Sequence, residues 1–264
     1  MQHEIKSKMP EWIWSDANFS MCLSNDIDSF FSATLLKKIK NWNISHFYDF
    51  SSIYKSNQQP KGEKLIGVDI ALEGNAYCFD NHVTLLNAGD TPNPNSCNIN
   101  NILNITRDNY FQKYCMGTNM LILSLFSVFD LKSLSDDQKI FLWCVDVSYK
   151  GHYSNYENDR NAHSTYIEIL QLEPIADVFD RYSPDDFRQF IKEYLLFENI
   201  KVNEAGRLTT GIRLDLVQKL FPELELSLPE EKFIKTHSFK LGKANLPQNK
   251  KLFKGENKRL FSSP

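Results

Sequence analysis

Short apolar runs that each lead to an aspartate are the feature of this sequence that most constrains its fold. Three runs have the length and composition of buried strands, and Asp26, Asp69 and Asp80 follow or end them. The runs are FSMCLS (19–24), KLIGVDIA (64–71) and AYCFD (76–80). In an α/β fold, residues just past strand ends meet along one edge of the sheet, where such folds place their sites. We therefore expect these acids to converge.

The order of the predicted elements indicates the fold class. After the first run, IDSFFSATLLKKIKNW places Phe31, Leu35 and Ile39 at helical spacing, which predicts a helix over 28–41. The segment ISHFYDF (44–50) then has the pattern of a strand. Strand, helix and strand in succession predict an α/β fold, with a parallel sheet and flanking helices in the N-terminal part.

The sequence changes character after about residue 150. Three helical segments follow a polar stretch that holds His152 and His163, which we expect at the surface. From Lys232 onward, nine lysine and arginine residues stand against one acid, although the whole chain has a net charge of −3. Such a basic segment suits phosphates or an acidic partner surface. We predict an α/β domain at 1–155, a mostly helical domain at 156–228 and a basic, flexible tail at 229–264.

Composition restricts the class of protein. A hydrophobic content of 42% in 264 residues is enough for a packed core and argues against a mainly disordered chain. No apolar stretch reaches the roughly 18 residues that span a bilayer, and the first residues lack the apolar core of a secretory signal. The five cysteines form no CxxC pair, which argues against a zinc cluster. We expect a cytoplasmic protein with no membrane association.

Further residues extend the acidic set. Asp28 lies two residues after Asp26, His82 lies two residues after Asp80, and Asp146 ends the apolar segment FLWCVD. An acid at a helix end is disfavoured by the helix dipole, which favours a functional role for Asp146. Several carboxylates in one place repel each other unless a cation or a proton lies among them. Oxygen ligands suit Mg²⁺ and Mn²⁺, and two such ions clamp a phosphoryl group for in-line attack.

Four motifs, in this order, resemble those of the DHH family of phosphoesterases, which has RecJ-like and oligoribonuclease-like members. CLSNDIDSFFSATLL resembles the first motif, with Asp26 and Asp28 at its aspartate positions, and LIGVDIA resembles the second, with Asp69. YCFDNHVT resembles the Asp-His-His triplet, and FLWCVDVSYKGH resembles the fourth motif, with Asp146. The resemblance covers about residues 18–155.

The resemblance implies roles for these residues. Asp26, Asp28, Asp69 and Asp146 would hold Mn²⁺ or Mg²⁺. His82 would contact the scissile phosphate, with Asp80 as its orienting partner.

Two departures weaken the expected metal set. The family's first-motif histidine falls on Cys22, and the middle histidine of the triplet falls on Asn81. A thiolate prefers softer metals, and an asparagine offers only a neutral carbonyl. The glycine-rich, histidine-containing motif of the family's second domain has no counterpart after residue 150. The site therefore keeps its carboxylates but lacks two imidazoles.

Three functions remain open from the sequence. The first is a manganese-dependent phosphodiesterase or exonuclease acting on single-stranded nucleic acid, short oligonucleotides or a nucleotide messenger. The second is a degenerate module that binds nucleotides or serves as a structural subunit, with a protein partner or a second copy of the chain. The third reads DIDS as the motif of a haloacid-dehalogenase-like phosphatase, with Asp26 as nucleophile. That reading leaves Asp69 and His82 without a role.

Overall fold

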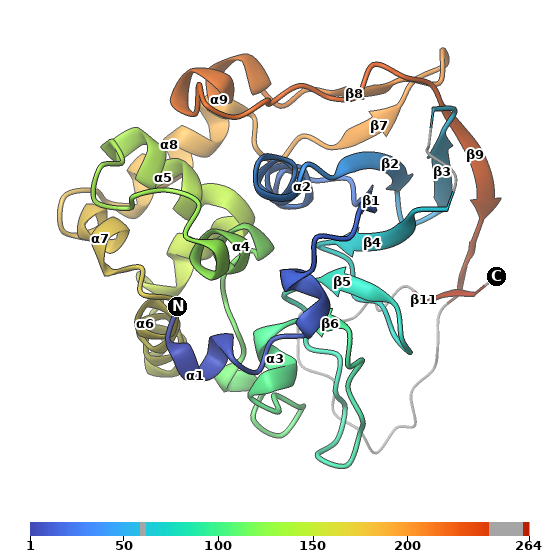
Figure 1. Ribbon diagram of the computed structural model, residues 1–264. Coiled ribbons are helices and arrows are strands. Elements are labelled where there is room, and N and C mark those ends of the chain that lie inside the picture. The colour runs from blue at the N-terminus through green and yellow to red at the C-terminus, as the bar shows by residue number, and fades with distance from the viewer. Residues whose placement is uncertain (59–61, 243–260, 264) are drawn as a thin grey trace.

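A single mixed sheet forms the centre of the fold. The computed structural model describes residues 1–58, 62–242 and 261–263. The sheet strands are β1 (Phe19–Leu23), β2 (Asn43–Tyr48), β3 (Ser52–Ser56), β4 (Lys64–Val68), β5 (Tyr77–Phe79), β6 (Ser96–Cys97) and β9 (Phe233–Ser238). They lie in the order β6-β5-β4-β1-β2-β3-β9 (Figure 1).

The sheet is mostly parallel, which confirms the predicted α/β class. Neighbouring strands from β6 to β2 are all parallel. β3 is antiparallel to β2 and to β9. β1, β2, β4 and β5 coincide with the four predicted strands to within two or three residues at each end. β3, β6 and β9 were not predicted from the sequence.

Helices gather on one side of the sheet (Figure 1). They are α1 (His3–Lys6), α2 (Ile27–Lys40), α3 (Ile99–Ile102), α4 (Thr118–Phe126), α5 (Asp136–Cys144), α6 (Glu157–Leu170), α7 (Glu173–Ala176), α8 (Pro184–Tyr194) and α9 (Leu214–Leu220). Short 3-10 helices are η1 (Glu11–Trp14), η2 (Tyr110–Gln112), η3 (Val145–Gly151) and η4 (Asp177–Asp180). Small two-stranded pairs are β7 (Ile200–Val202) with β8 (Leu208–Thr210), and β10 (Lys240–Gly242) with β11 (Phe261–Ser263).

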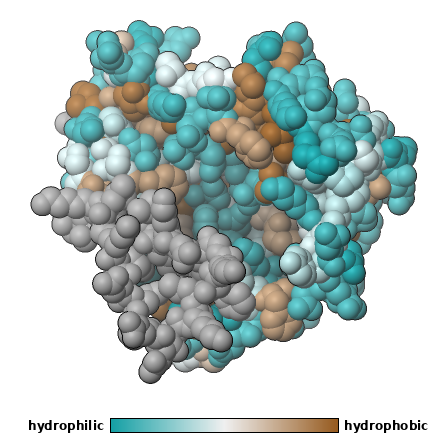
Figure 2. Space-filling view, turned by 180° about the vertical axis from the view of Figure 1, so that it is seen from behind, coloured by the Kyte–Doolittle hydropathy of each residue, from teal (hydrophilic) through white to brown (hydrophobic). Residues whose placement is uncertain are grey.

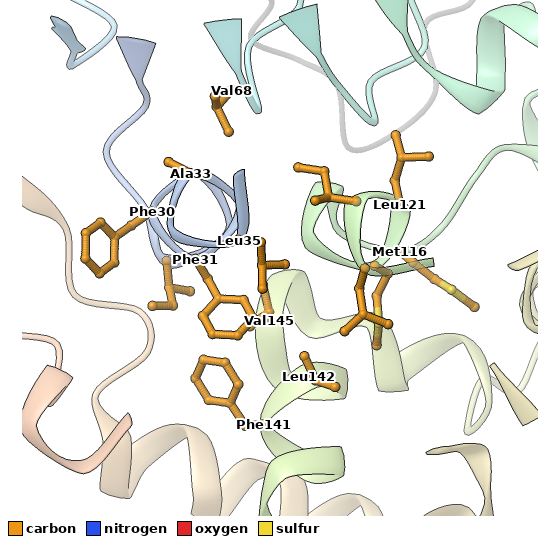
Figure 3. Close-up of a cluster of buried hydrophobic side chains, with 14 of the residues drawn as sticks. Phe30, Phe31, Ala33, Leu35, Val68, Met116, Leu121, Phe141, Leu142 and Val145 are labelled. Atoms are coloured by element: carbon orange, nitrogen blue, oxygen red, sulfur yellow. The ribbon is translucent and has the colours of Figure 1, made fainter. Parts of the chain in front are cut away.

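α2 lies between the sheet and the other helices, and its first ten residues are all buried. A helix buried on every side needs small and apolar residues around its whole circumference. Phe31 of α2 packs edge-on against Phe141 of α5, with ring centroids 4.9 Å apart (Figure 3). One continuous hydrophobic cluster extends from Ile5 to Phe233. This packing fixes the start of α2 against the ends of the strands.

The C-terminal half mixes helices with strands. Residues 156–228 contain α6 to α9 and the β7–β8 hairpin. Within the predicted tail from residue 229, β9 pairs with β3 at the edge of the main sheet. Residues 243–260 and Pro264 of that tail lie outside the described residues. In the part of the chain that the structure describes, no helix has the length and apolar character needed to cross a membrane.

The expectation that His163 lies at the surface is wrong. The residue is only 1% exposed. Its ring centroid lies 5.3 Å from that of Trp143, because α6 turns this side chain towards α5. A polar stretch of sequence therefore carries one inward-facing position.

Candidate functional site

Three neighbouring strands carry the candidate site at their carboxyl ends. β1 pairs with β2 on one side and with β4 on the other, so the sheet has a topological switch point at β1. Asp26 lies just past β1, and Asp69 and Asp80 directly follow β4 and β5. Ligand atoms of Asp69, Asp80 and His82 all lie within 4.8 Å of one another. The structure thus brings these predicted residues together.

His82 and Asp80 form an ion pair. His82 Nδ1 lies 2.7 Å from Asp80 Oδ1. Asp80 is fully buried, whereas the His82 side chain is 60% exposed. The hydrogen bond to Asp80, together with the charges of Asp80, Asp69 and Asp146, raises the pKa of His82 to about 9 in spite of partial burial. His82 is therefore protonated at neutral pH, with Nε2 left to contact a ligand.

Asp69 is held in an unusual backbone conformation. Its φ of 57° lies in the left-handed region, which few residues other than glycine, asparagine and aspartate adopt. Its Oδ1 accepts a hydrogen bond of 2.8 Å from Thr118 Oγ1. Burial, with the charge of Asp26, raises the pKa of Asp69 to about 8. Strained backbone of this kind is common at functional sites.

Asp146 reaches the same region from the helical side. It lies two residues past the end of α5, with a φ of 50°, and Val147 follows with a φ of 49°. A β-branched residue in the left-handed region is a clear outlier. Asp146 Oδ2 accepts a hydrogen bond of 3.1 Å from Asn81 Nδ2. Burial, followed by the charge of Asp26, raises the pKa of Asp146.

The two aspartates of the first motif have different surroundings. Asp26 caps α2, because its Oδ1 accepts a hydrogen bond of 3.0 Å from the Ser29 amide. Asp28 is buried, and its two oxygens accept the amide N–H groups of Thr118 at 2.7 Å and Asn119 at 2.8 Å. Asp28 also accepts a hydrogen bond from the Ser32 hydroxyl. A carboxylate has about four lone-pair sites. In Asp28, three of these sites accept hydrogen bonds. The two bonds from the Thr118 and Asn119 amides connect α2 to the start of α4.

Burial also sets the charge of these two acids. Burial raises the pKa of Asp26, although the Ser29 amide and the charge of His82 oppose the shift. Burial, and then the charges of Asp69, Asp146 and Asp26, hold the pKa of Asp28 well above its ordinary value. The charges of Asp69, Asp146 and Asp26 therefore favour the protonated form of Asp28.

The two departures from the DHH pattern have a clear structural setting. Cys22 is buried in β1, its thiol contacts the carbonyl of Leu23, and burial raises its pKa to about 12. It is a protonated core thiol at neutral pH. The Asn81 amide nitrogen donates to Asp146 and, at 3.1 Å, to the Met116 carbonyl. Within the described residues, no hydrogen bond reaches Asn81 Oδ1, so this oxygen is open to a ligand.

Several supporting residues were not predicted. Asn98 Nδ2 donates to Asp80 Oδ2 and to the His82 carbonyl, both at 2.8 Å. Asn100 Nδ2 donates to the Asn81 carbonyl at 2.8 Å. Both asparagines belong to the Asn-rich segment 86–104, whose composition was the available signal, since such loops often carry function. Thr118, the partner of Asp69, had no such signal, because it lies in an apolar helix.

Gly117 allows the close approach of α4 to the acids. A Cβ atom at this position would lie 2.4 Å from Asn119 Oδ1 and 2.9 Å from Asp28 Oδ2. Both side-chain polar atoms of Asn119 are buried, and within the described residues they have no hydrogen-bond partner. Residue 117 must therefore be glycine, because any Cβ atom there would collide with the side chains of Asn119 and Asp28.

A hard divalent cation would relieve the repulsion among the carboxylates of the site. Among the predicted metal ligands, Asp69 has an oxygen within 4.8 Å of ligand atoms of Asp80 and His82, whereas Asp26 and Asp146 lie outside this group. Asn81 Oδ1 adds a neutral oxygen, whereas Cys22 is buried and protonated. Comparisons of the chain with protein-family models, curated proteins and solved structures return no match.

Proposed function

We propose that the chain is a divalent-metal-dependent phosphoesterase of the DHH type, acting on nucleic acid ends, short oligonucleotides or a nucleotide messenger. One observation carries this proposal. Buried carboxylates with raised pKa values surround a protonated His82 at the switch point of an α/β sheet. Such perturbed groups in one place are typical of catalytic sites.

Asp26, Asp69 and Asp146 would hold Mn²⁺ or Mg²⁺, with Asn81 Oδ1 as a fourth oxygen. When bound, the cation supplies positive charge that stabilises the phosphoryl group during attack by water. Asp28 takes no direct part in this proposal, because its oxygens bind the start of α4. This differs from the family pattern, in which it would be a ligand.

His82 and Asp80 would act on the substrate itself. The imidazolium donates a hydrogen bond from Nε2 to a phosphoryl oxygen, where negative charge develops. Asp80 fixes the ring through Nδ1, and Asn98 holds Asp80 in turn. This chain of hydrogen bonds keeps His82 charged and oriented at neutral pH.

The five cysteines are all free thiols, which suits the reducing cytoplasm.

A degenerate, non-catalytic module is the second candidate. The observation that favours it is the hydrogen bond from Asn81 to Asp146, which replaces a metal-binding imidazole with an amide donor. In this alternative the carboxylates are protonated or hydrogen-bonded to amides and bind no metal. The chain then binds a nucleotide or a protein partner without hydrolysis.

Mn²⁺-dependent hydrolysis separates the two candidates. Wild-type protein is assayed with bis(p-nitrophenyl) phosphate, a labelled short oligonucleotide and a cyclic dinucleotide. Asp69→Asn keeps the side-chain shape and removes the central charge, and Asp185→Asn is the control, since the Asp185 side chain is 86% exposed on α8. The proposal expects metal-dependent activity that Asp69→Asn lowers at least about 100-fold. Absence of activity on every phosphoester would favour the module.

A further inference from the structure

An apolar groove lies between η3, α8 and the turn that follows α8. Its volume is about 410 Å³. Tyr149 and Ile191 form its buried part, at 3% and 4% exposure. Leu195 and Phe197 line it from the turn, at 43% and 72% exposure. The groove therefore joins a buried apolar floor to two apolar side chains in contact with water.

Exposed apolar side chains that lie together are informative on a surface of this kind. Hydrophilic residues predominate on the molecular face shown in Figure 2. Single exposed apolar residues are ordinary, whereas grouped ones mark sites of interaction with other molecules. Leu195 and Phe197 are two positions apart and line the same groove, which indicates a binding surface.

Leu195 has a backbone conformation that leucine rarely adopts. It follows the last residue of α8 with a φ of 50°, in the left-handed region. The helices α2, α4 and α6 end in the same conformation with the polar residues Asn41, Ser127 and Gln171. Glycine or asparagine is usual at such a position. A leucine there keeps an apolar side chain at the groove, although a polar residue would suit the helix end better.

The charge beside the groove is positive. Lys150, Arg188 and Lys192 line it, against a single acid, Glu198. Arg188 forms an ion pair with Asp185. Lys150 and Lys192 form no ion pair with any residue that the structure describes. Their charges are therefore available to an acidic partner.

This positive charge differs from the charge of the surrounding chain. The whole chain has a net charge of −3, and residues 232–264 hold nine lysine and arginine residues against one acid, so residues 1–231 have a net charge of −11. The basic side chains at the groove are therefore not a consequence of composition. An acidic partner is attracted to this patch and repelled by the acidic remainder, which directs it to the groove.

A polypeptide suits the groove better than a small molecule does. Small-molecule sites enclose most of their ligand. Phe197 is 72% exposed, so a molecule that fills only the groove would leave much of this ring in water. A polypeptide segment extends beyond the groove and covers Leu195 and Phe197 together. Aromatic side chains are also prominent among the residues that dominate the binding energy of protein interfaces.

We propose that this groove binds an acidic, amphipathic segment of a partner protein. An apolar side chain of the segment packs on Ile191 and Phe197, and neighbouring carboxylates pair with Lys150 and Lys192. The proposal is independent of the phosphoesterase function, because it involves neither a metal nor hydrolysis.

Selection from a phage library of random dodecapeptides, with the whole chain as the immobilised target in EDTA, tests the proposal. Wild-type protein is expected to enrich peptides that combine an aromatic or aliphatic residue with several acids. An enriched peptide is then labelled, and its Kd is measured by fluorescence anisotropy. Phe197→Ala is expected to raise this Kd about tenfold, and the variant should fold normally because the side chain is largely exposed.

The basic residues are tested with the same peptide. Lys150→Ala with Lys192→Ala is expected to raise Kd about fivefold at low salt and by less at high salt, because salt screens exposed ion pairs. The matched controls are Ile234→Ala, 60% exposed on β9, and Lys132→Ala with Lys235→Ala, both exposed and outside the groove. These controls are expected to bind as wild type does.

Three results would overturn the proposal. Wild-type protein that enriches no peptides, or only peptides without acids, does not have the proposed surface. Groove variants that bind the peptide as tightly as their controls do would place its site elsewhere. Binding of phosphatidylserine vesicles or decanoate that is lost in Phe197→Ala, without peptide binding, would assign the groove to a lipid instead.

Discussion

His82 Nδ1 lies 2.7 Å from Oδ1 of Asp80, and this pair joins a fully buried acid to a side chain that is 60% exposed. The acid cannot be reached by water, so its charge acts mainly on the imidazole. Asn98 holds the other carboxylate oxygen, which leaves the Asp80 side chain little freedom to turn. The pair therefore holds the positively charged His82 ring in a fixed position beside the other carboxylates of the site.

Asp80→Asn should lower the pKa of His82 from about 9 towards the ordinary value near 6.5, because the hydrogen bond to the Asp80 carboxylate is the main cause of the shift. NMR titration of the His82 ring protons measures this directly. His237→Asn, exposed on β9, assigns one control resonance. An unchanged His82 titration in Asp80→Asn would show that the ion pair does not form.

Through Asp69 and His82, metal-free protein should lose stability as the pH rises from about 4 to 9, with Asp69 acting up to about pH 8 and His82 from about pH 6.5 to 9. Asp69, with a pKa of about 8, and His82, with a pKa of about 9, bind protons more tightly in the folded state than in the unfolded state. Stability from such groups is present at low pH and is lost as the pH passes their folded pKa values. Urea unfolding in EDTA at a series of pH values measures how the free energy of unfolding changes with pH.

Asp69→Asn should stabilise the metal-free protein at pH 9, by on the order of 2 kcal/mol, because it removes a buried charge. The asparagine still accepts the hydrogen bond from Thr118 and tolerates the left-handed backbone. Urea unfolding of this variant beside Asp185→Asn gives the difference. A variant less stable than wild type at pH 9 would show that the carboxylates do not repel one another.

The two acids of the first motif should respond differently to substitution. Asp26→Asn keeps the cap on Ser29 and should leave stability within about 0.5 kcal/mol of wild type, whereas Asp26→Ala should cost about 1 kcal/mol. Asp28→Ala should cost about 3 kcal/mol or more, since it leaves two buried amides of α4 without an acceptor. Thermal unfolding of the three variants measures the order. Equal losses for Asp28→Ala and Asp26→Ala would refute the assigned role of Asp28.

His163 should oppose the buried acids as the pH falls. Burial, and then the charge of His152, lowers the pKa of His163 to about 4. At His163 the unfolded state therefore binds more protons between pH 6.5 and 4, so this residue alone destabilises the protein as the pH falls, whereas Asp69 stabilises it in the same window. Relative to wild type, His163→Leu should gain stability at pH 4 compared with pH 6.5, while His237→Leu should not. A His163→Leu profile parallel to that of wild type in this window would contradict this role of His163.

The sequence predicted those parts of the fold that depend on local pattern. β1, β4 and β5 were found because each is a short apolar run, and the acids after them converge because neighbouring parallel strands end at one edge. β9 could not be found in this way, since its partner β3 lies about 180 residues earlier in the chain. β6 has only two residues, in a segment with the composition of a loop.

The site was predictable to the same extent. Asp69, Asp80 and His82 were singled out and lie together. The capping role of Asp28 depends on Thr118 and Asn119, which are about 90 residues away, so no local spacing reveals it. The burial of Cys22 depends equally on long-range packing.

Binding of Mn²⁺ tests the central claim most directly. Wild-type, Asp69→Asn and Asp185→Asn proteins are titrated with Mn²⁺ at pH 8 by isothermal titration calorimetry, with metal content measured after gel filtration. We expect saturable binding by the wild type and by Asp185→Asn, and its loss in Asp69→Asn. Wild-type protein that binds no Mn²⁺, or an Asp69→Asn variant that binds it as tightly as wild type, would contradict a cation site among these carboxylates.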